Sequence, residues 1–418
     1  MRGWTAFRPL RHRNFALVWS AAAISNIGTW METVAVGDLV AHRTGQAGWT
    51  ALVAAAGFLP MGLMGPIGGA IADHVDRRRF MFVTTLLQTV CAALLAVEAA
   101  TDHASPGAVV FVVFAAGCVA GIGFPAYQSM LPDMVPQEDL LAAVSLGQAQ
   151  FNFGRVIGPA LAGVAIAVGS YTAAFTINTI SFGAMLLALL ALRLDERDRP
   201  PPEGSILSRI RVGVRVARAE PGVRVATLMI AVAALTVSPF IGLIPAMARV
   251  RFHSDEVLTS AFVTAQGLGA VAGALLVPTL AERFGRHRVL MYGLLALPAS
   301  VVLYGAAPTS ALAFVALLLV GGTYISVLGG LGTVVQLRAP AELRARVLSI
   351  YFLALGTLYP IGLAIQGPIA DRVGLGEVTV AGALLLLVVV VLVRAVRPER
   401  LLALDDLDAY PAGEIVPV

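Results

Sequence analysis

Residues 69–80 read GAIADHVDRRRF and form a short charged hinge between two long apolar runs of the chain. The pattern returns 209 residues later, at 280–290, as LAERFGRHRVL, with Glu282 in the position of Asp73. Each copy is followed by another long apolar run, so the surroundings of the hinge repeat together with its charges. The sequence therefore predicts two homologous halves that run in parallel.

The composition indicates a membrane protein. The chain has 418 residues, of which 58% are hydrophobic and only 13% are charged. A soluble domain is typically nearer half apolar and a quarter charged. The runs 15–39, 108–128 and 378–393 approach or exceed the roughly 20 residues that cross a hydrocarbon layer about 30 Å thick. We therefore expect an all-α polytopic membrane protein.

The apolar runs between polar or Gly/Pro breaks predict twelve transmembrane helices in two pseudo-symmetric six-helix bundles. We expect one bundle at 1–193, a basic linker at 194–222, a second bundle at 223–397 and a tail at 398–418. The twelve expected spans are 14–40, 49–70, 80–99, 107–128, 140–168, 171–192, 223–247, 258–280, 289–306, 311–336, 347–370 and 378–396.

The arginines set the expected orientation, because all 29 basic residues are arginine. Cytoplasmic segments carry an excess of positive charge. With the amino terminus inside, one arginine lies within a span and 24 lie on the cytoplasmic side. Both termini are therefore expected in the cytoplasm of a multi-pass protein of the bacterial cytoplasmic membrane. The four arginines left outside are Arg43, Arg249, Arg251 and Arg372.

Two segments fall outside the spans. In the linker, the prolines at 200–202 stop any helix, and Ser205 can cap a short amphipathic helix after them. That helix either lies on the anionic inner leaflet or forms part of a solvated tether. The tail after Pro398 is acidic and is expected to be disordered.

The hinge resembles a motif of the major facilitator superfamily, G-x-L-A-D-R-x-G-R-R-x-x-L, which lies there between spans two and three. His74 and Asp76 depart from the pattern, and the second copy keeps Arg283 and Gly285. The chain resembles this superfamily over nearly its whole length, which implies the major facilitator fold. The matching residues of the first copy are Gly69, Ala72, Asp73, Arg77 and Arg78.

Three further sequence segments resemble one branch of the superfamily. They are GTWMETVAVGDLV at 28–40, FLPMGLMGPIGGAIAD at 58–73 and APAELRARVLSI at 339–350. The branch contains enterobactin exporters and macrolide-efflux proteins, and the resemblance implies an exporter driven by the proton gradient.

The two hinge copies predict a cytoplasmic gate. Asp73 is expected to face Arg344 and Arg346 at the start of span eleven, while Arg283 and Arg286 face the start of span five. Individual surface pairs contribute only about 0–1 kcal/mol, so the set matters more than any member. The gate and hinge residues are Gly69, Asp73, Arg77, Arg78, Glu138, Asp139, Glu282, Arg283, Arg286, Arg344 and Arg346.

Span five carries a polar stripe. Ser145, Gln148, Asn152, Arg155 and Pro159 follow one another at spacings of three and four residues, so they share one helical face. A charged group within a span is a candidate for function. The span also resembles the antiporter motif G-x8-G-x3-G-P-x2-G-G, which implies export; close helix packing is the alternative explanation for its glycines. The matching residues are Gly154, Gly158, Pro159 and Gly163.

Span one places Ser25, Thr29 and Glu32 on one face. At about 1.5 Å per residue, Glu32 lies at a depth similar to that of Arg155. We expect this pair to couple transport to protons: paired, Glu32 stays ionised, and separated from Arg155 it takes up a proton. The alternative for Glu32 is a side chain that extends to the outer interface of the membrane. The candidate cavity residues are Ser25, Asn26, Thr29, Ser145, Gln148, Asn152, Gln266, Tyr324, Tyr351 and Tyr359.

The sequence contains no nucleotide-binding loop, metal-ligand cluster or hydrolase pattern. We therefore expect no enzyme activity, no cofactor and no metal, with the proton gradient as the energy source. The expected function is a proton-coupled exporter of amphipathic small molecules such as a drug, siderophore or secreted metabolite. It acts as a monomer with substrate, protons and membrane lipid as partners, and without nucleic acid. The alternatives are an uptake carrier of the same fold and a non-transporting sensor or assembly factor.

Overall fold

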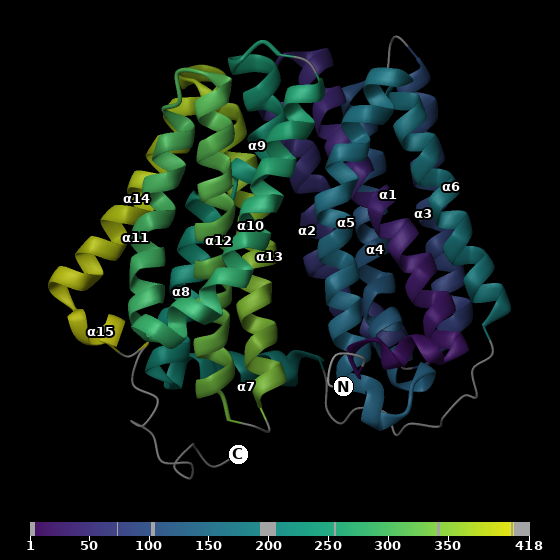
Figure 1. Ribbon diagram of the computed structural model, residues 1–418, viewed down its shortest axis with the longest axis horizontal. Helices are drawn as coiled ribbons and strands as arrows, with labels where there is room; N and C mark the ends of the chain where they lie inside the picture. Colours follow the sequence, from purple (N-terminus) through teal and green to yellow (C-terminus); the bar gives the residue numbers. More distant parts are fainter. Residues whose placement is uncertain are drawn as a thin grey trace. The chain divides into compact units, whose positions relative to one another are not determined.

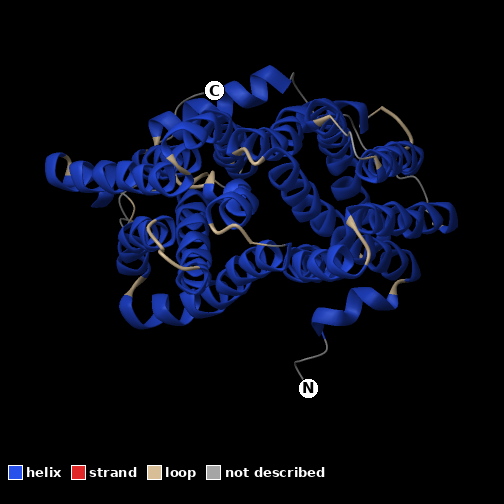
Figure 2. Cartoon of the chain, turned by 90° about the horizontal axis from the view of Figure 1, so that it is seen from above, coloured by secondary structure: helices blue, strands red, loops and turns tan. Residues whose placement is uncertain are grey.

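The computed structural model describes residues 5–72, 74–101, 105–192, 206–254, 256–340, 343–402 and 404. Every regular element within these ranges is a helix, and the helices are joined by short loops (Figures 1 and 2). Before residue 200 the elements are η1 (Thr5–Arg11), α1 (Arg13–Thr44), α2 (Ala47–Ala72), α3 (Arg77–Ala100), α4 (Pro106–Met134), η2 (Gln137–Asp139), α5 (Leu140–Val168) and α6 (Tyr171–Ala191).

The remaining elements follow the expected linker. They are α7 (Ile206–Ala219), α8 (Pro221–Thr236), α9 (Phe240–Ala246), η3 (Met247–Arg251), α10 (Glu256–Phe284), α11 (Arg286–Gly305), α12 (Ser310–Arg338), α13 (Arg344–Val373), α14 (Leu375–Val396) and α15 (Pro398–Leu402).

Eleven helices in the described part of the chain are long and apolar enough to cross a membrane. One of them, Pro221–Arg251, combines α8, α9 and η3. The helix α1 is outside this group although it has 32 residues, more than the roughly 20 that a span requires. Its apolar sequence is interrupted by Asn26, Glu32 and Asp38. The chain is thus an all-helical, polytopic membrane protein.

The helix boundaries repeat with the offset of the sequence. The helix α2 begins at Ala47 and α10 at Glu256, an offset of 209 residues. The helix α4 begins at Pro106 and α12 at Ser310, an offset of 204 residues, and both helices have 29 residues. The internal repeat therefore extends from the hinge motif to the order and length of the helices.

The chain divides into two compact units. The first consists of residues 1–202 together with 244–264, so the end of the seventh expected span and the start of the eighth group with it. Within this unit α2 packs on α4, α1 on α5 and α6, and α3 on α6. The crossing of α2 and α4 requires glycine, because a Cβ at Gly68 would lie 2.1 Å from the carbonyl oxygen of Ile122.

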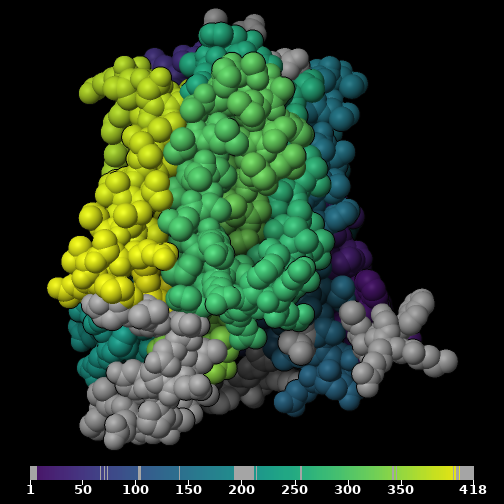
Figure 3. Space-filling view, turned by 60° about the vertical axis from the view of Figure 1, so that its left-hand side comes forward, coloured from purple at the N-terminus to yellow at the C-terminus, as the bar shows by residue number. Residues whose placement is uncertain are grey.

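The second unit consists of residues 203–243 and 265–418. In it α11 packs on α12 and α14, and α8 packs on α13. Figure 3 shows α14 in yellow, side by side with the green helices of this unit. The expected span at 223–247 is interrupted, because α8 ends at Thr236 and α9 begins only at Phe240.

The linker helix α7 lies across the lower ends of the helices of the second unit and packs on α13 and α8 (Figure 1). Its Val216 and Ala217 are buried, whereas Arg215 and Arg218 are exposed. Directly after it, Glu220 caps α8 and forms a buried ion pair with Arg338 of α12, 2.6 Å long. This pair fixes the start of α8. The linker residues 194–205 and the tail residues 403 and 405–418 are outside the described ranges.

Candidate functional site

The first polar centre of the first unit surrounds Glu32 of α1. The Nδ2 atom of Asn178 on α6 donates to Glu32 Oε2 at 2.7 Å, and Ser181 Oγ donates to Asn178 Oδ1 at 3.0 Å. Asn178 is fully buried and Glu32 is partly buried. A buried charge is costly unless hydrogen bonds compensate it, and among the described residues Asn178 is the one side chain that donates to this carboxylate.

Gly28 makes this centre possible. A Cβ at this position would lie 2.4 Å from both Asn178 Oδ1 and Ser181 Oγ. Contacts below about 3 Å do not occur without a shift of the neighbours, so α1 approaches the polar face of α6 only because residue 28 has no side chain. Gly28 lies one helical turn before Glu32 and therefore sets the distance between the carboxylate and Asn178.

Arg155 reaches the same part of α1 from α5. Its guanidinium carbon lies 5.7 Å from the centroid of the Trp30 ring, a cation–π geometry. Trp30 also meets Phe151 edge to face, with ring centroids 5.5 Å apart. The structure thus places both coupling candidates at one level of α1, two residues apart at Trp30 and Glu32. The coupling role of Glu32 and Arg155 stays a prediction.

The glycines of the expected antiporter motif lie where α5 crosses α1. A Cβ at Gly158 would lie 2.6 Å from Trp30 Cβ, and one at Gly154 would lie 3.2 Å from the backbone of Asn26. Both positions therefore serve the close approach of the two helices. Gly163, further along α5, faces Ser260: a Cβ added at Gly163 would lie 2.8 Å from the Cβ of Ser260.

The remaining cavity candidates are distributed over both units. Ser25 is buried and Thr29 donates to its carbonyl oxygen at 3.0 Å, whereas the α5 stripe residues Ser145, Gln148 and Asn152 are exposed. In the second unit all four candidates are buried. Tyr324 Oη lies 3.0 Å from Ser238 Oγ, and Tyr351 donates to the carbonyl oxygen of Leu328 at 2.8 Å; the other two are Gln266 of α10 and Tyr359 of α13.

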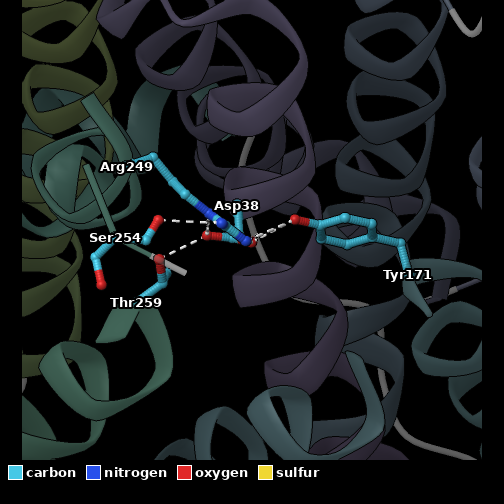
Figure 4. Close-up of polar contacts among 5 residues, drawn as sticks. All are labelled: Asp38, Tyr171, Arg249, Ser254 and Thr259. Carbon is cyan, nitrogen blue, oxygen red and sulfur yellow. Dashed lines mark hydrogen bonds and ion pairs between the residues drawn. The ribbon is translucent and has the colours of Figure 1, made fainter. Parts of the chain in front are cut away.

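A second polar centre lies at the far end of α1, around Asp38 (Figure 4). Arg249 Nε donates to Asp38 Oδ1 at 2.8 Å and its Nη2 donates to Oδ2 at 2.6 Å. Tyr171 Oη and Thr259 Oγ1 each donate to the carboxylate at 2.5 Å. Asp38 is fully buried. The carboxylate therefore accepts four hydrogen bonds, two of them from a guanidinium in the bidentate geometry that makes such pairs strong.

This Asp38 cluster joins four elements of the first unit. Asp38 belongs to α1, Tyr171 is the first residue of α6, Arg249 lies in η3 and Thr259 in α10. Arg249 also donates from Nη1 to the carbonyl oxygen of Ser254 at 3.1 Å, which fixes the turn between η3 and α10. The sequence analysis placed Arg249 on the outer side, but it assigned neither Arg249 nor Tyr171 or Thr259 to a site. Their spacing carries no signal, since Asp38 and Arg249 are 211 residues apart.

The hinge residues of the first unit have local partners. Arg77 forms an ion pair with Asp133 at 3.5 Å. Arg78 donates to the carbonyl oxygens of Leu189 and Leu190 at 2.6 and 2.8 Å, which compensates free carbonyls at the end of α6. Gly69 lies in α2, and Asp73 is outside the described residues.

Two acidic gate candidates are bound by the amino-terminal segment. Arg8 forms ion pairs with Glu138 and, at 3.2 Å, with Asp139, and His12 Nε2 lies 2.8 Å from Asp139 Oδ2. In the second unit the basic candidates and Glu282 are exposed, and the guanidinium of Arg283 lies 5.3 Å from the Phe284 ring centroid. The expected gate stays a prediction; its other exposed members are Arg286, Arg344 and Arg346.

Many spanning helices arranged as an internal repeat are the architecture of a secondary membrane transporter, and the family model reported next assigns this chain to the major facilitator superfamily. The chain belongs to the family described as transmembrane secretion effectors, whose model matches residues 4–415. This confirms the resemblance seen in the sequence.

The similar proteins include efflux pumps. The chain is 28% identical over 403 residues to the multidrug efflux pump Tap of Mycolicibacterium fortuitum, covering 93% of this chain and 96% of that protein. It is 22% identical over 382 residues to macrolide efflux protein A of Streptococcus pyogenes, covering 90% and 94%. A solved structure of the nucleoside transporter NupG superposes with a TM-score of 0.70 at 13% identity, covering 92% and 99%, which shows the fold.

Proposed function

We propose that this protein is a proton-coupled exporter of amphipathic small molecules such as a drug, a siderophore or a secreted metabolite. It works by alternating access in the bacterial cytoplasmic membrane, as a monomer with both termini in the cytoplasm. The helix α1 is the first of twelve spans, since its 32 residues exceed the length that a span requires. Full-length similarity to multidrug and macrolide efflux pumps supports export rather than uptake.

The observation that carries the coupling is the hydrogen bonding of Glu32. This carboxylate lies within α1 and accepts from Asn178 at 2.7 Å. Ionisable groups inside a span are costly and are found on substrate and proton pathways. A carboxylate with one amide donor can exchange a proton without breaking an ion-paired network. When Glu32 is ionised the site attracts a cationic or hydrogen-bond-donating substrate, and when it is protonated that attraction is lost.

Transport by everted membrane vesicles from cells that express the protein tests the proposal. An acidic vesicle interior should drive accumulation of a macrolide or a fluorescent amphipathic cation, and an uncoupler should abolish it. Glu32→Gln should lower this gradient-driven accumulation at least tenfold and leave downhill exchange largely intact. Glu98→Gln, a carboxylate change in the last turn of α3, is the matched control and should retain wild-type accumulation.

The outcomes separate the alternatives. Full gradient-driven accumulation by Glu32→Gln would place proton coupling at another residue. Accumulation of the substrate by whole cells, with none by everted vesicles, would identify an uptake carrier. Absence of flux for every substrate in both orientations, by a folded protein, would favour a non-transporting sensor or assembly factor.

A further inference from the structure

A groove of about 460 Å³ lies within the second unit between α8, α13 and α14. Its wall is almost entirely apolar, with side chains such as Ile369, Val378 and Leu385. Ile369 and Leu385 are 43% and 52% exposed, so the groove opens on the surface of these spanning helices. Its volume is in the range of small-molecule sites, which are typically about 300–1,000 Å³.

Gln366 supplies a polar atom to this groove. The helix α8 ends at Thr236, so its last carbonyl groups lack helical partners. The Nε2 atom of Gln366 on α13 donates to the carbonyl oxygens of Leu235 and Thr236, at 3.0 and 2.9 Å. An amide nitrogen has two N–H groups, and both are used here. What Gln366 can still offer to a molecule in the groove is its carbonyl oxygen, a hydrogen-bond acceptor.

Glu377 supplies the second polar group. It is the third residue of α14, and its side chain is exposed at one end of the groove. Gln366 lies seven residues before the end of α13, so the two side chains are separated by roughly 10 Å along the span. The neighbouring Asp371 and Arg372 of α13 do not line the groove. Glu377 is therefore the charged residue among those that form its wall.

We propose that this groove binds an amphipathic cation. The ammonium or other cationic group lies at Glu377, a hydrogen-bond donor of the same molecule contacts Gln366 Oε1, and the apolar body fills the space beside Ile369 and Leu385. Both polar groups act as acceptors, so the site favours cations and donors and repels anions. The groove faces the surface that acyl chains cover, so it takes the ligand from the membrane. The proposal concerns equilibrium binding and holds whether or not the protein exports.

Photolabelling of the purified protein in zwitterionic lipid nanodiscs tests the site. The probe is a long-chain alkyl trimethylammonium that carries a benzophenone, and labelled positions are mapped by mass spectrometry. We expect saturable labelling of α13 and α14. Glu377→Gln should raise the apparent Kd at least fivefold, and Ala381→Phe, which fills the groove, should reduce labelling at least tenfold.

Three controls make the result specific. Asp371→Asn removes a negative charge from the same end of α13 outside the groove and should change the Kd less than twofold. A neutral probe with a tert-butyl group in place of the trimethylammonium should bind more weakly. Its apparent Kd should be the same for the wild type and for Glu377→Gln. Val391→Phe, at an exposed position on another face of α14 and further from the groove, controls for added bulk.

Two results would overturn the proposal. Labelling that rises linearly with probe concentration would show that only lipid acyl chains occupy the groove. Saturable labelling that is unaffected by Glu377→Gln would show an apolar site without selectivity for cations. Should Ala381→Phe fail to give monodisperse protein, the Glu377→Gln result with the two matched probes decides by itself.

Discussion

Two carboxylates of α1 have opposite surroundings although they are six residues, about 9 Å, apart. Asp38 is fully buried and accepts four hydrogen bonds, two of them from Arg249. Glu32 is partly buried and accepts one, from the neutral side chain of Asn178. The Asp38 carboxylate is thus compensated by a network that joins it to Arg249 and to two hydroxyl groups. Glu32 is bound, among the described residues, by one neutral donor only.

Within one helix, a carboxylate with four donors thus contrasts with a carboxylate that has a single neutral donor. The Asp38 cluster joins four elements of the first unit and is expected to contribute to stability while intact. Breaking such a buried pair is strongly destabilising because it leaves one charge without compensation. The Glu32 centre is expected to contribute little to stability. The predictions below test this contrast, from the largest expected effect to the smallest.

Arg249→Leu should produce the largest loss of stability. It leaves Asp38 buried with only hydroxyl donors, which corresponds to about 3–5 kcal/mol. Chemical unfolding of the purified protein in detergent, followed by tryptophan fluorescence, measures the effect. Arg251→Leu removes the same charge two residues away and should cost less than about 1 kcal/mol. Equal losses in both variants would contradict the special role of the Asp38 cluster.

The double variant Asp38→Leu/Arg249→Leu should recover much of that loss. Apolar replacement of a whole buried ion pair is often close to neutral, whereas removal of one partner is not. We expect the double variant to be more stable than Arg249→Leu alone by at least about 1 kcal/mol. A double variant less stable than either single variant would show that the two residues do not act as a pair.

Gly28→Ala should disturb the Glu32 centre through its packing. The added methyl group would lie 2.4 Å from Asn178 Oδ1 and Ser181 Oγ, so these buried side chains must shift or α1 and α6 must separate. Overpacking of this kind costs about 1–3 kcal/mol, and gradient-driven transport should fall because Asn178 moves away from Glu32. Gly183→Ala is the matched control, since nothing lies within 4 Å of a Cβ there. Unfolding and vesicle transport of both variants are to be compared.

Tyr171→Phe should have a moderate effect. It removes one charge-assisted hydrogen bond to Asp38 and leaves Arg249 and Thr259 in place, for a loss of about 1.5–3 kcal/mol at most. Tyr292→Phe, at an exposed position of α11, should be neutral. Denaturant midpoints of the two variants measure the difference, and an unchanged midpoint for Tyr171→Phe would remove this hydroxyl from the network.

Glu32→Gln should have the smallest effect on stability, below about 1 kcal/mol, because glutamine can still accept from Asn178. If Glu32 couples transport to protons as proposed, the same variant should lose proton-driven transport, so that stability and activity separate. Asp38→Asn should show the reverse order, with the larger loss in unfolding free energy. If Glu32→Gln destabilised the protein as much as Asp38→Asn, the contrast between the two carboxylates would be wrong.

The sequence predicted the helices with close agreement wherever the signal was local. The expected span at 140–168 coincides with α5, and the span expected at 171–192 differs by one residue from α6. The span expected at 223–247 is broken instead. Proline at 239 lacks the N–H that a continuous helix would use, and Gln366 compensates the carbonyls at the break. That partner lies 130 residues away from Thr236, so the sequence did not indicate it.

The sequence by itself determined the polytopic helical class, the internal repeat and the family, because apolar run length and motif spacing are properties of neighbouring residues. It also selected Glu32 and Arg155, since charge within an apolar run is visible locally. Only the tertiary structure decided which carboxylate is compensated. Asp38 lies near a helix end, where charge is normally solvated, and its burial depends on Tyr171, Arg249 and Thr259 from three other elements. Hydrogen bonds between distant segments leave no periodic trace in the chain, so the Asp38 cluster emerges only when those segments pack together.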